Sequence, residues 1–527
     1  MIDQRGRCGN TDYCSDAVKQ RIFILPGAES FICPRCSQPL QNAGAARKRS
    51  RTALVLQASV ILLGTAALTY KLIGQAGPLW ASAGAVPPNG KAQAALRTVP
   101  LHDAGGGSAR TVLLRIAGSD IIGAKLAPRL AANYLGLIGS TDIAASPGSA
   151  EGMIEVIGQQ SGQRDTVTIT LNSAAAGFDM LLRRTADVAM SATRISGDEA
   201  RRLEALGDMT SPEAEAVIAV QGIAVAVSPA NPVASLTLPQ LRGVFSGRIT
   251  NWAELGGTAG PVHVHVAQGR GGAIAPQEVG IGQDGITATA TWVTGGAMAA
   301  ALAADRGGIG LLPFGSTGPA RVLALGDGAA AVTPSRLTIS DESYPLVRRL
   351  YLYTAPSAGS PLARRFTDYV STPPGQAAIE AAGFVPLMVR SEAALASVPV
   401  PEVPPDRLRQ VLAGATRMSM EFRLQPGASA LDSRSARDLD RLAAHLRTQR
   451  ISPNRLILAG FTDNSGVPQA SRATAQAWAE AVAAALARGG IAPGRIMSFG
   501  SDMPVADNAT PDGRERNRRV EVYLAPP

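Results

Sequence analysis

The stretch TVLLRIAGSDIIGAKLAPRLAANYL, residues 111–135, decides the fold class of the longest folded region of this chain. It begins with a short apolar segment that is typical of a buried strand and continues into an Ala/Leu-rich segment that is typical of a helix. Similar segments follow in TVTITL (166–171), GFDMLLRRT (177–185) and ADVAMSA (186–192). Strands that alternate with helices predict an α/β architecture in which helices cover a sheet.

Two linker-like segments divide the chain around this region. Residues 75–109 are rich in Gly, Ala and Pro, and residues 391–407 end in the Pro-rich string SVPVPEVPPDR. They delimit one folded region at 110–390 and a second at 408–525. Because the chain has 527 residues, of which 46% are hydrophobic, it is long enough to bury the cores of two or three domains.

An apolar run precedes the first linker and carries no charge from Thr52 to Tyr70. About 20 apolar residues cross a bilayer as a helix, so we predict one transmembrane helix at residues 52–74. A cleaved signal peptide is the alternative, but about 50 residues precede the run. Four basic residues lie within 47–51, whereas only Lys71 lies near the other end. The positive-inside rule therefore places the N-terminus in the cytoplasm and exports the large C-terminal part.

The cysteines of the chain all precede this run. They follow the pattern C-x5-C, then 18 residues, then C-x2-C, and in a reducing compartment such clusters are more often metal ligands than disulfides. Between the pairs, RIFILP and ESFI alternate like a short hairpin. We predict a cytoplasmic zinc ribbon at residues 1–45 with one structural Zn; free or lipid-modified thiols are the alternative. The expected ligands are Cys8, Cys14, Cys33 and Cys36.

Composition and motifs argue against two other classes of function. The net charge is +9, but of the 50 Lys and Arg residues only five are Lys, and the Arg residues are scattered without interleaved aromatic residues, so we expect no nucleic-acid binding. His263 and His265 share one face of a strand in VHVHV, but no carboxylate or thiol accompanies them in the motif. We interpret them as ordinary strand residues. No H-E-x-x-H, G-x-S-x-G or Walker sequence occurs, and we expect no enzyme.

Several strings within 110–390 resemble the phosphate-type periplasmic solute-binding proteins, above all LRGVFSGRITNW (241–252) and YPLVRRLYLY (344–353). The resemblance covers nearly the whole region. It implies a two-lobed α/β domain of the type 2 periplasmic-binding fold, with a hinge between the lobes and a ligand cleft. In such a cleft, helix N-termini and hydroxyl groups hold an oxyanion.

The loops that bind the anion in that family are only partly kept in this chain. The first loop keeps Gly118 and Ser119, whereas the second continues from Ser173 into alanines and the third, VAQGRGGAIA, has Arg270 displaced by three residues. Each lost hydrogen bond to a charged group costs about 1.5–3 kcal/mol, so we predict a degenerate phosphate site. The residues expected at the solute cleft are Gly118, Ser119, Asp120, Ser191 and Thr193.

The region 408–525 alternates predicted strands and helices and has the character of an α+β domain. Its strings GFTDNSG (460–466) and GRERNRRVEVYL (513–524) resemble the OmpA-like domain that binds peptidoglycan. In that family an Asp takes the ammonium group of diaminopimelate, and an Arg on the following helix takes its carboxylate.

The resemblance carries the Asp of that clamp over to Asp463, but an ungapped count places Trp478 at the Arg position. An indole cannot replace a guanidinium group. Trp478 also shares an i, i+4, i+8 stripe with two apolar residues, which favours a buried ring over one that stacks on a ligand. Asp463 alone could equally form a turn with the residues after it. Arg472 lies about 120° around the helix, so Arg514 or Arg518 would have to supply the charge. The expected peptidoglycan-binding residues are Thr462, Asp463, Ser471, Arg514 and Arg518.

The leading hypothesis is a single-pass protein of the bacterial inner membrane with periplasmic C-terminal domains. It would act as a non-catalytic scaffold or sensor of the cell envelope, because both exported regions keep family strings while they lose charged ligand contacts. The alternative is a functional phosphate- or oxyanion-binding protein that is tethered to the cell wall and feeds or regulates an ABC transporter. The expected partners are peptidoglycan, a small anionic or polar solute, the inner membrane and a membrane or transporter protein.

Overall fold

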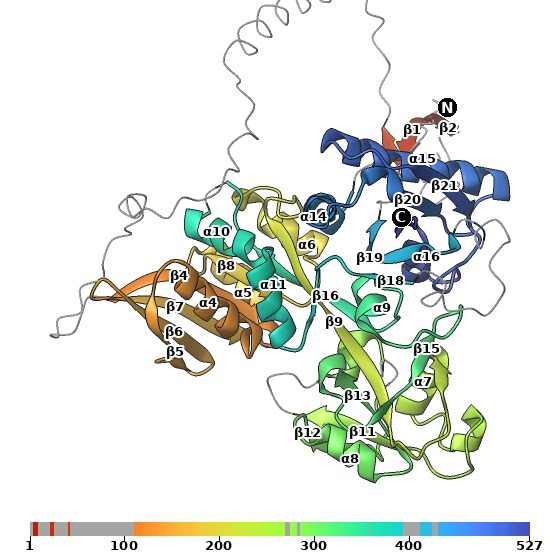
Figure 1. Ribbon diagram of the computed structural model, residues 1–527. Coiled ribbons are helices and arrows are strands. Elements are labelled where there is room, and N and C mark those ends of the chain that lie inside the picture. The colour runs from red at the N-terminus through yellow and green to blue at the C-terminus, as the bar shows by residue number, and fades with distance from the viewer. Residues whose placement is uncertain are drawn as a thin grey trace, which may run out of the picture. The chain divides into compact units, whose positions relative to one another are not determined.

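The protein divides into two compact units, Met1–Leu96 and Arg97–Pro527 (Figure 1). A computed structural model gives its architecture. The residues that this structure describes are 4–8, 22–25, 40–42, 110–268, 274–281, 285–357, 359–393, 410, 412–423 and 431–526.

The first unit contains a small antiparallel sheet of the strands β1 (Gln4–Cys8), β2 (Ile22–Leu25) and β3 (Leu40–Asn42), in the order β2-β1-β3. β2 lies within RIFILP, as predicted, and it pairs with β1. ESFI, the other half of the predicted hairpin, lies outside the described residues. Of the four predicted zinc ligands, only Cys8 lies in a described element. Cys14, Cys33 and Cys36 lie outside the described residues, so the zinc ribbon stays a prediction.

The predicted membrane span, residues 52–74, and the linker that follows it also lie outside the described residues. Within the described ranges, no helix combines the length and the apolar character that crossing a bilayer requires.

The second unit begins with a 12-stranded sheet that two lobes share, and we call residues 110–390 the two-lobed domain. Along the sheet the main order is β12-β11-β13-β9-β16-β8-β4-β7-β6-β5, and two short strands pair with β9 off this path. Lobe 1 contributes β4 (Arg110–Ser119), β5 (Thr141–Pro147), β6 (Met153–Gln160), β7 (Gln163–Asn172), β8 (Val188–Ser191) and β17 (Val385–Pro386). Lobe 2 contributes β11 (His263–Gln268), β12 (Thr291–Thr294), β13 (Gly308–Pro313) and β14 (Arg321–Val322), with a separate parallel pair of β10 (Ser235–Thr237) and β15 (Ala324–Gly326).

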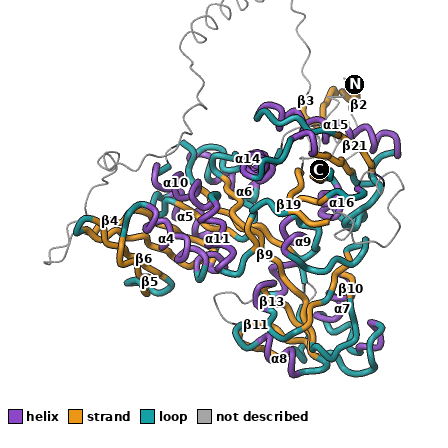
Figure 2. Tube along the Cα trace, viewed as in Figure 1, coloured by secondary structure: helices purple, strands orange, loops and turns teal. Residues whose placement is uncertain are grey.

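Two strands, β9 (Glu215–Val227) and β16 (Val347–Tyr353), connect the lobes. All 13 residues of β9 are buried, in keeping with its two runs of Ala, Val and Ile on either side of Gln221 and Gly222. Its first half pairs with β16 and its second half pairs with β13. Figures 1 and 2 show β9 as one long strand that passes from the side of β8 to the side of β13. The predicted two-lobed α/β fold is therefore confirmed, and β9 and β16 are its hinge strands.

Helices cover both lobes. Lobe 1 carries α3 (Asp120–Gly123), α4 (Leu126–Leu137), α5 (Ala174–Leu182), α6 (Gly197–Arg202), α10 (Pro361–Val370) and α11 (Pro373–Ala381), and lobe 2 carries α7 (Leu238–Phe245), α8 (Met298–Ala304) and α9 (Arg336–Ser340). Short 3₁₀ turns lie at Glu204–Leu206, Trp252–Leu255, Pro276–Val279 and Phe314–Ser316.

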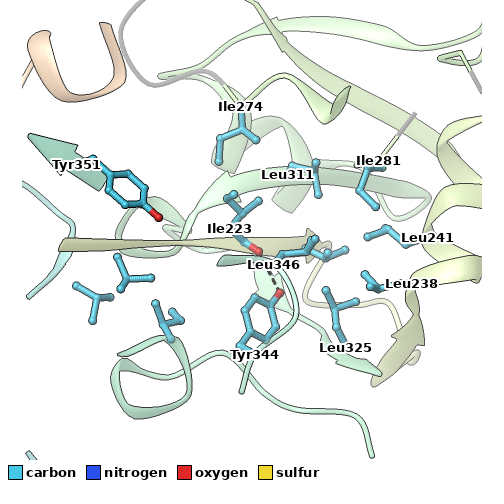
Figure 3. Close-up of a cluster of buried hydrophobic side chains, with 14 of the residues drawn as sticks. Ile223, Leu238, Leu241, Ile274, Ile281, Leu311, Leu325, Tyr344, Leu346 and Tyr351 are labelled. Carbon is cyan, nitrogen blue, oxygen red and sulfur yellow. Dashed lines mark hydrogen bonds between the residues drawn. The ribbon is translucent and has the colours of Figure 1, made fainter. Parts of the chain in front are cut away.

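A buried apolar cluster fills lobe 2 where it meets the hinge strands (Figure 3). Leu238 and Leu241 of α7 pack with Leu311 of β13 and with Ile223 of β9. Tyr344 is fully buried in this cluster, and its hydroxyl donates a hydrogen bond of 3.0 Å to the carbonyl of Ile223. The hydroxyl thereby finds the partner that a buried polar group requires.

The C-terminal domain, residues 391–526, is an α+β domain around one five-stranded sheet. The strand order is β18-β19-β22-β20-β21, with β18 (Ser391–Ala393), β19 (Thr416–Arg423), β20 (Leu456–Phe461), β21 (Arg495–Gly500) and β22 (Arg519–Leu524). Its helices are α14 (Ser433–Thr448), α15 (Pro468–Arg488) and α16 (Pro511–Asn517), with a 3₁₀ turn at Pro453–Arg455.

One predicted boundary is wrong by three residues. Ser391–Ala393, assigned to the linker, form β18 and pair with β19. The domain border therefore lies at the start of β18, because its backbone hydrogen bonds belong to the C-terminal sheet. The two domains also touch: α14 packs against β9, and α9 packs against β19.

Candidate functional site

The predicted solute-cleft residues of lobe 1 lie at the carboxyl ends of two neighbouring parallel strands. β4 and β8 pair with Gly118 opposite Met190, so the turn at Gly118–Asp120 lies beside the loop that follows Ser191. Gly118 has φ +130°, and a Cβ atom there would lie 2.2 Å from the carbonyl oxygen of Met190. Only glycine fits at this position. The structure thus brings the predicted residues Gly118, Ser119, Asp120, Ser191 and Thr193 together at one sheet edge, where α/β folds commonly bind ligands.

Some of the hydroxyl groups at this edge already hold backbone partners. The buried Ser191 hydroxyl donates to the carbonyl of Thr193 at 2.5 Å and accepts from the amide of Thr193 at 3.1 Å. Ser173 caps α5 by accepting from the amide of Ala176 at 3.2 Å. Ser119 stands at the N-cap of α3 without a side-chain capping bond among the described residues. The hydroxyl of the exposed Thr193 lies 3.4 Å from that of Ser191. Within the part of the chain that the structure describes, Ser119 is thus the hydroxyl of this edge without a side-chain capping bond, and Thr193 is the exposed one.

The third anion loop of lobe 2, residues 269–273 with Arg270, lies outside the described residues. The degenerate phosphate site consequently stays a prediction.

A charged group that the sequence did not reveal lies behind the cleft loop. Arg194 follows Thr193 directly, and its Nε lies 3.0 Å from the buried carboxylate of Glu215 at the start of β9. The Tyr353 hydroxyl of β16 also donates to Glu215, at 3.0 Å, and accepts from the amide of Ile195. Burial, and after it the charge of Glu215, raises the pKa of Tyr353 well above its usual range. The cleft loop is thus tied to both hinge strands.

The two strand histidines have an acceptor that lies outside their motif. Nδ1 of His263 lies 3.0 Å from the Asp305 carboxylate and Nε2 of His265 lies 2.9 Å from it, and Asp305 follows α8. Burial alone would raise the pKa of the Asp305 carboxyl, but hydrogen bonds from both histidines hold it below its usual range. Within the described residues, no group of His, Cys, Asp and Glu could hold a metal ion. Hydrogen bonding to Asp305 is therefore the role that the structure gives these histidines.

The predicted clamp residue Asp463 follows β20 and is almost fully buried. One carboxylate oxygen accepts from the amide of Ser465 at 3.1 Å and from its hydroxyl at 2.5 Å, which forms the expected turn. The other oxygen accepts from Nη1 of Arg518 at 2.7 Å. Burial opposes ionisation, but the bonds from Ser465 and Arg518 hold the pKa of Asp463 below its usual range. Asp463 therefore makes the turn and a charged pair at once.

The register of the sheet explains why Arg518 meets Asp463. β20 and β22 pair antiparallel with Phe461 opposite Arg519, so the residues just after β20 face the residue just before β22. Arg518, one of the two arginines expected to supply the charge, is thus the one that pairs with Asp463. Trp478 is half-buried and packs against the core, as its stripe predicted. Arg472 points elsewhere, as expected, and lies 3.7 Å from Asp502.

Two polar atoms beside the pair of Asp463 and Arg518 lack a partner in the described part of the chain. Oγ1 of Thr462 and Nε of Arg518 are buried and have no hydrogen-bond partner among the described residues. Ser471 is buried in the first turn of α15. Arg514 donates instead to the carbonyls at 508 and 509. The candidate site that the structure assembles is thus Asp463, Arg518 and Thr462, with Ser471 in the neighbouring helix.

Sequence reasoning missed Asn508, which contacts the backbone of the Asp463 turn in this candidate site. The side-chain oxygen of Asn508 accepts from the amide of Asn464 at 3.3 Å and from Nδ2 of Asn517 at 2.9 Å. These bonds hold the segment before α16 beside the Asp463 turn. No sequence signal linked Asn508 to Asp463, because 44 residues separate Asn508 from Asn464.

Two family models match the chain. The model for the PBP superfamily domain matches residues 127–373, and the model for the OmpA family matches residues 424–518.

The chain is also similar to several known proteins over parts of its length. Outer membrane porin F of Pseudomonas fluorescens is 33% identical over 115 residues, which are 21% of this chain and 35% of that protein. Phosphate-binding protein PstS 2 of Streptococcus pneumoniae serotype 4 is 27% identical over 121 residues, 23% of this chain and 37% of that protein. The chain thus spans little more than a third of either relative. A phosphate transport receptor structure from Vibrio cholerae has a TM-score of 0.41 and 20% identity, and it covers 52% of this chain and 99% of its own.

Proposed function

Because the chain joins a PBP superfamily domain to an OmpA family domain, we propose that it is a non-catalytic envelope protein that grips peptidoglycan through its C-terminal domain. Both families are of binding, non-catalytic kinds. The proposal rests above all on the pairing of Asp463 with Arg518 next to the buried hydroxyl of Thr462, which has no hydrogen-bond partner among the residues that the structure describes.

Asp463 and Arg518 offer complementary charges to a zwitterion. The carboxylate of Asp463 can accept hydrogen bonds from an ammonium group, and the guanidinium of Arg518 can donate to a carboxylate. A peptidoglycan stem peptide that contains diaminopimelate carries both groups on one residue. On binding, it would replace the internal pair of Asp463 and Arg518 with two charge-assisted pairs, so neither protein charge would be left buried and alone.

The test is a pull-down of the full-length protein with isolated sacculi. Asp463→Asn keeps the shape of the side chain and removes its charge, and a charged hydrogen bond is worth about 1.5–3 kcal/mol, so binding should weaken about 10- to 150-fold. Arg518→Met should weaken it to a similar extent. Arg472→Met is the matched control, because it removes an exposed arginine of the same domain that is 3.7 Å from its nearest partner. Equal retention of the Asp463→Asn and Arg472→Met variants on sacculi would show that Asp463 and Arg518 do not form the peptidoglycan-binding site.

For the two-lobed domain we propose a solute-binding-like module with a degenerate phosphate site. The hydroxyls of Ser173 and Ser191 support this proposal, because each already has a backbone hydrogen-bond partner within the protein. The second candidate is a working oxyanion receptor that feeds or regulates a transporter. The uncapped hydroxyl of Ser119 and the exposed side chain of Thr193 at the sheet edge favour it. Calorimetry with inorganic phosphate separates the two. Micromolar or tighter affinity supports the receptor, and the absence of binding supports the degenerate module.

The proposed topology places the protein in the inner membrane by one helix at residues 52–74, with a zinc-bound head in the cytoplasm. The uncharged run and the cysteine spacing support it. Protease added to spheroplasts should remove the C-terminal domains and spare the head. Purified full-length protein should carry one zinc per chain, and Cys33→Ser should lower that content.

A further inference from the structure

The C-terminal domain contacts both lobes of the two-lobed domain and the hinge strands between them. On the side of lobe 1, α14 supplies the contacts. The hydroxyl of Ser433 hydrogen-bonds to the buried carboxylate of Glu215, the first residue of β9. One turn further, Nη2 of Arg437 donates to the carbonyl of Pro212 at 2.7 Å. The N-terminal end of α14 is therefore held on lobe 1, directly behind the cleft loop that Glu215 also anchors.

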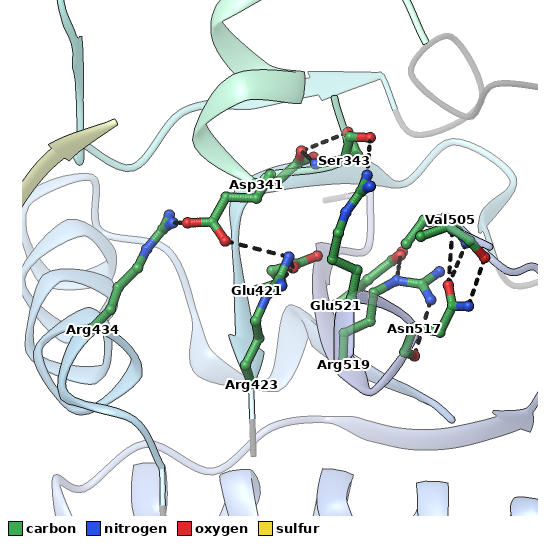
Figure 4. Close-up of polar contacts among 12 residues, drawn as sticks. Asp341, Ser343, Glu421, Arg423, Arg434, Val505, Asn517, Arg519 and Glu521 are labelled. Atoms are coloured by element: carbon green, nitrogen blue, oxygen red, sulfur yellow. Dashed lines mark hydrogen bonds and ion pairs between the residues drawn. The ribbon is translucent and has the colours of Figure 1, made fainter. Parts of the chain in front are cut away.

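At the hinge, the same helix end meets β16. Nη1 of Arg349 lies 2.7 Å from the carboxylate of Asp432, the N-cap residue of α14. Arg349 also binds Glu342, with Nε 2.6 Å from one carboxylate oxygen. Arg434 of α14 pairs with Glu342 and donates to the carbonyl of Ser340. These groups form one buried charged cluster that spans the two domains; Figure 4 shows Arg434 and its neighbours.

On the side of lobe 2, a different part of the C-terminal domain makes the contacts. Nη1 of Arg516, in α16, lies 2.8 Å from the carboxylate of Asp327, and its Nη2 donates to the carbonyl of Ser343 at 3.0 Å. Backbone packing adds to this contact. A Cβ atom on Gly328 would lie 2.7 Å from the side chain of Asp507, so the turn after β15 lies tightly against the C-terminal domain.

The contacts differ in how far water reaches them. The side chains of Arg434 and Glu342 are 3% and 7% exposed, whereas those of Arg516 and Asp327 are 14% and 17% exposed. Arg417 of β19 and Asp341, which follows α9, form a further pair between the domains and are 4% and 0% exposed. Buried ion pairs tolerate little displacement, because moving one partner leaves the other charge desolvated and alone. A lobe that rotated about β9 and β16 would have to break either the contacts of α14 or those of Arg516.

We infer that the C-terminal domain is a brace that holds the two lobes at one angle. Lobe closure of the hinge type moves the lobes against each other about the connecting strands. Here one folded domain is bonded to lobe 1, to the hinge and to lobe 2 together. The lobes can therefore close only when α14 or α16 leaves its contacts, so lobe closure and the placement of the C-terminal domain are linked. The inference does not require the proposed peptidoglycan site.

The test measures the distance between the lobes in the full-length protein. Leu137 in lobe 1 and Trp292 in lobe 2 are 63% and 55% exposed, which suits them for labels. A ketone-bearing amino acid at both positions carries a fluorophore pair, so the four cysteines stay unlabelled. The brace predicts one narrow distance distribution for the otherwise wild-type protein, and at least a twofold broader one when Ser433→Ala, Arg434→Met and Arg516→Met are combined.

Two further variants keep the result interpretable. Arg516→Met alone removes only the contact to lobe 2 and should broaden the distribution by an intermediate amount. Arg110→Met removes an ion pair inside lobe 1, 2.5 Å from Glu155, and should leave the distribution unchanged. Hydrogen exchange in β4 and β7 shows that lobe 1 is still folded. Equal widths of the inter-lobe distance distribution in the wild type, the triple variant and Arg516→Met would overturn the brace. This result is independent of the sacculus pull-down and of the phosphate calorimetry.

Discussion

Replacing Glu342 by Gln should weaken the structure far more than an ordinary surface change. The Glu342 side chain is 7% exposed and binds three guanidinium groups: two contacts of 2.6 and 3.1 Å to Arg349, one of 3.4 Å to Arg423, and the pair with Arg434. Gln keeps the shape but removes the charge. Breaking a buried pair by removing one partner costs about 3–5 kcal/mol, and a domain has only about 5–15 kcal/mol of stability.

The cost should depend on pH in a defined direction. Burial alone would raise the pKa of the Glu342 carboxyl, but the charges of Arg349, Arg434 and Arg423 hold it far below its usual range. A carboxyl whose pKa is lower in the folded state stabilises the fold above its unfolded pKa of about 4.3 and loses that contribution as the pH falls toward the folded pKa. The advantage of the wild type over Glu342→Gln should thus shrink by about 1.4 kcal/mol per pH unit below about pH 4.

Urea unfolding of the full-length wild type and of Glu342→Gln measures the difference in unfolding free energy. Hydrogen exchange in β9 and in α14 follows the unfolding of each of the two domains. The control is Glu155→Gln, which removes the partly exposed pair with Arg110 in lobe 1 and should cost about 1 kcal/mol or less. A loss below 1 kcal/mol for Glu342→Gln at pH 7, or a loss that is undiminished at pH 3, would refute the reasoning.

Three further changes test other parts of the structure. Burial alone would raise the pKa of Glu521, but the charges of Arg417 and Arg519 lower it to about 2. Glu521→Gln should therefore destabilise the C-terminal domain by about 3 kcal/mol at pH 7, measured by thermal unfolding. This loss should fade as the pH drops from about 4.5 to about 2. Tyr344→Phe removes the hydrogen bond to Ile223 and should lower the unfolding free energy by about 1–2 kcal/mol in urea. Gly460→Ala would place a Cβ atom 2.1 Å from the carbonyl oxygen of Ala475 and should destabilise the packing of α15 on β20 by about 1–3 kcal/mol, measured by hydrogen exchange in β20.

Each of these changes has a result that would contradict it. A pH-independent loss for Glu521→Gln would mean that its charge is not what stabilises the domain. Unchanged stability of Tyr344→Phe would mean that the Ile223 carbonyl is satisfied without the hydroxyl. For Gly460→Ala, the matched comparison is Gly260→Ala, because neither glycine has a positive φ and no atom lies within 4 Å of a Cβ atom at Gly260. An equal loss at both sites would attribute the effect to the loss of glycine itself rather than to the helix contact.

The elements themselves were largely readable in the sequence. The apolar run TVLLRIAG became β4, and the Ala/Leu-rich segment after it became α4. Strand and helix periodicity depend on neighbours within a few residues, so a local pattern is sufficient to predict them. The family strings likewise located both matched domains. The short strand β18 was missed because three residues inside a Pro-rich stretch give no periodic signal.

What only the tertiary structure decided are the partners that lie far apart in the chain. Arg518 reaches Asp463 across 55 residues because β20 and β22 pair in one register, and Ser433 reaches Glu215 across 218 residues because α14 packs on the hinge. The sequence does not show which opposite charge a charged residue will pair with, because many residues of opposite charge are available in the chain. The sequence by itself therefore identified the two matched domains and most of their elements. Strand register and domain docking decided which charges meet, because those contacts exist only once distant segments share one buried interface.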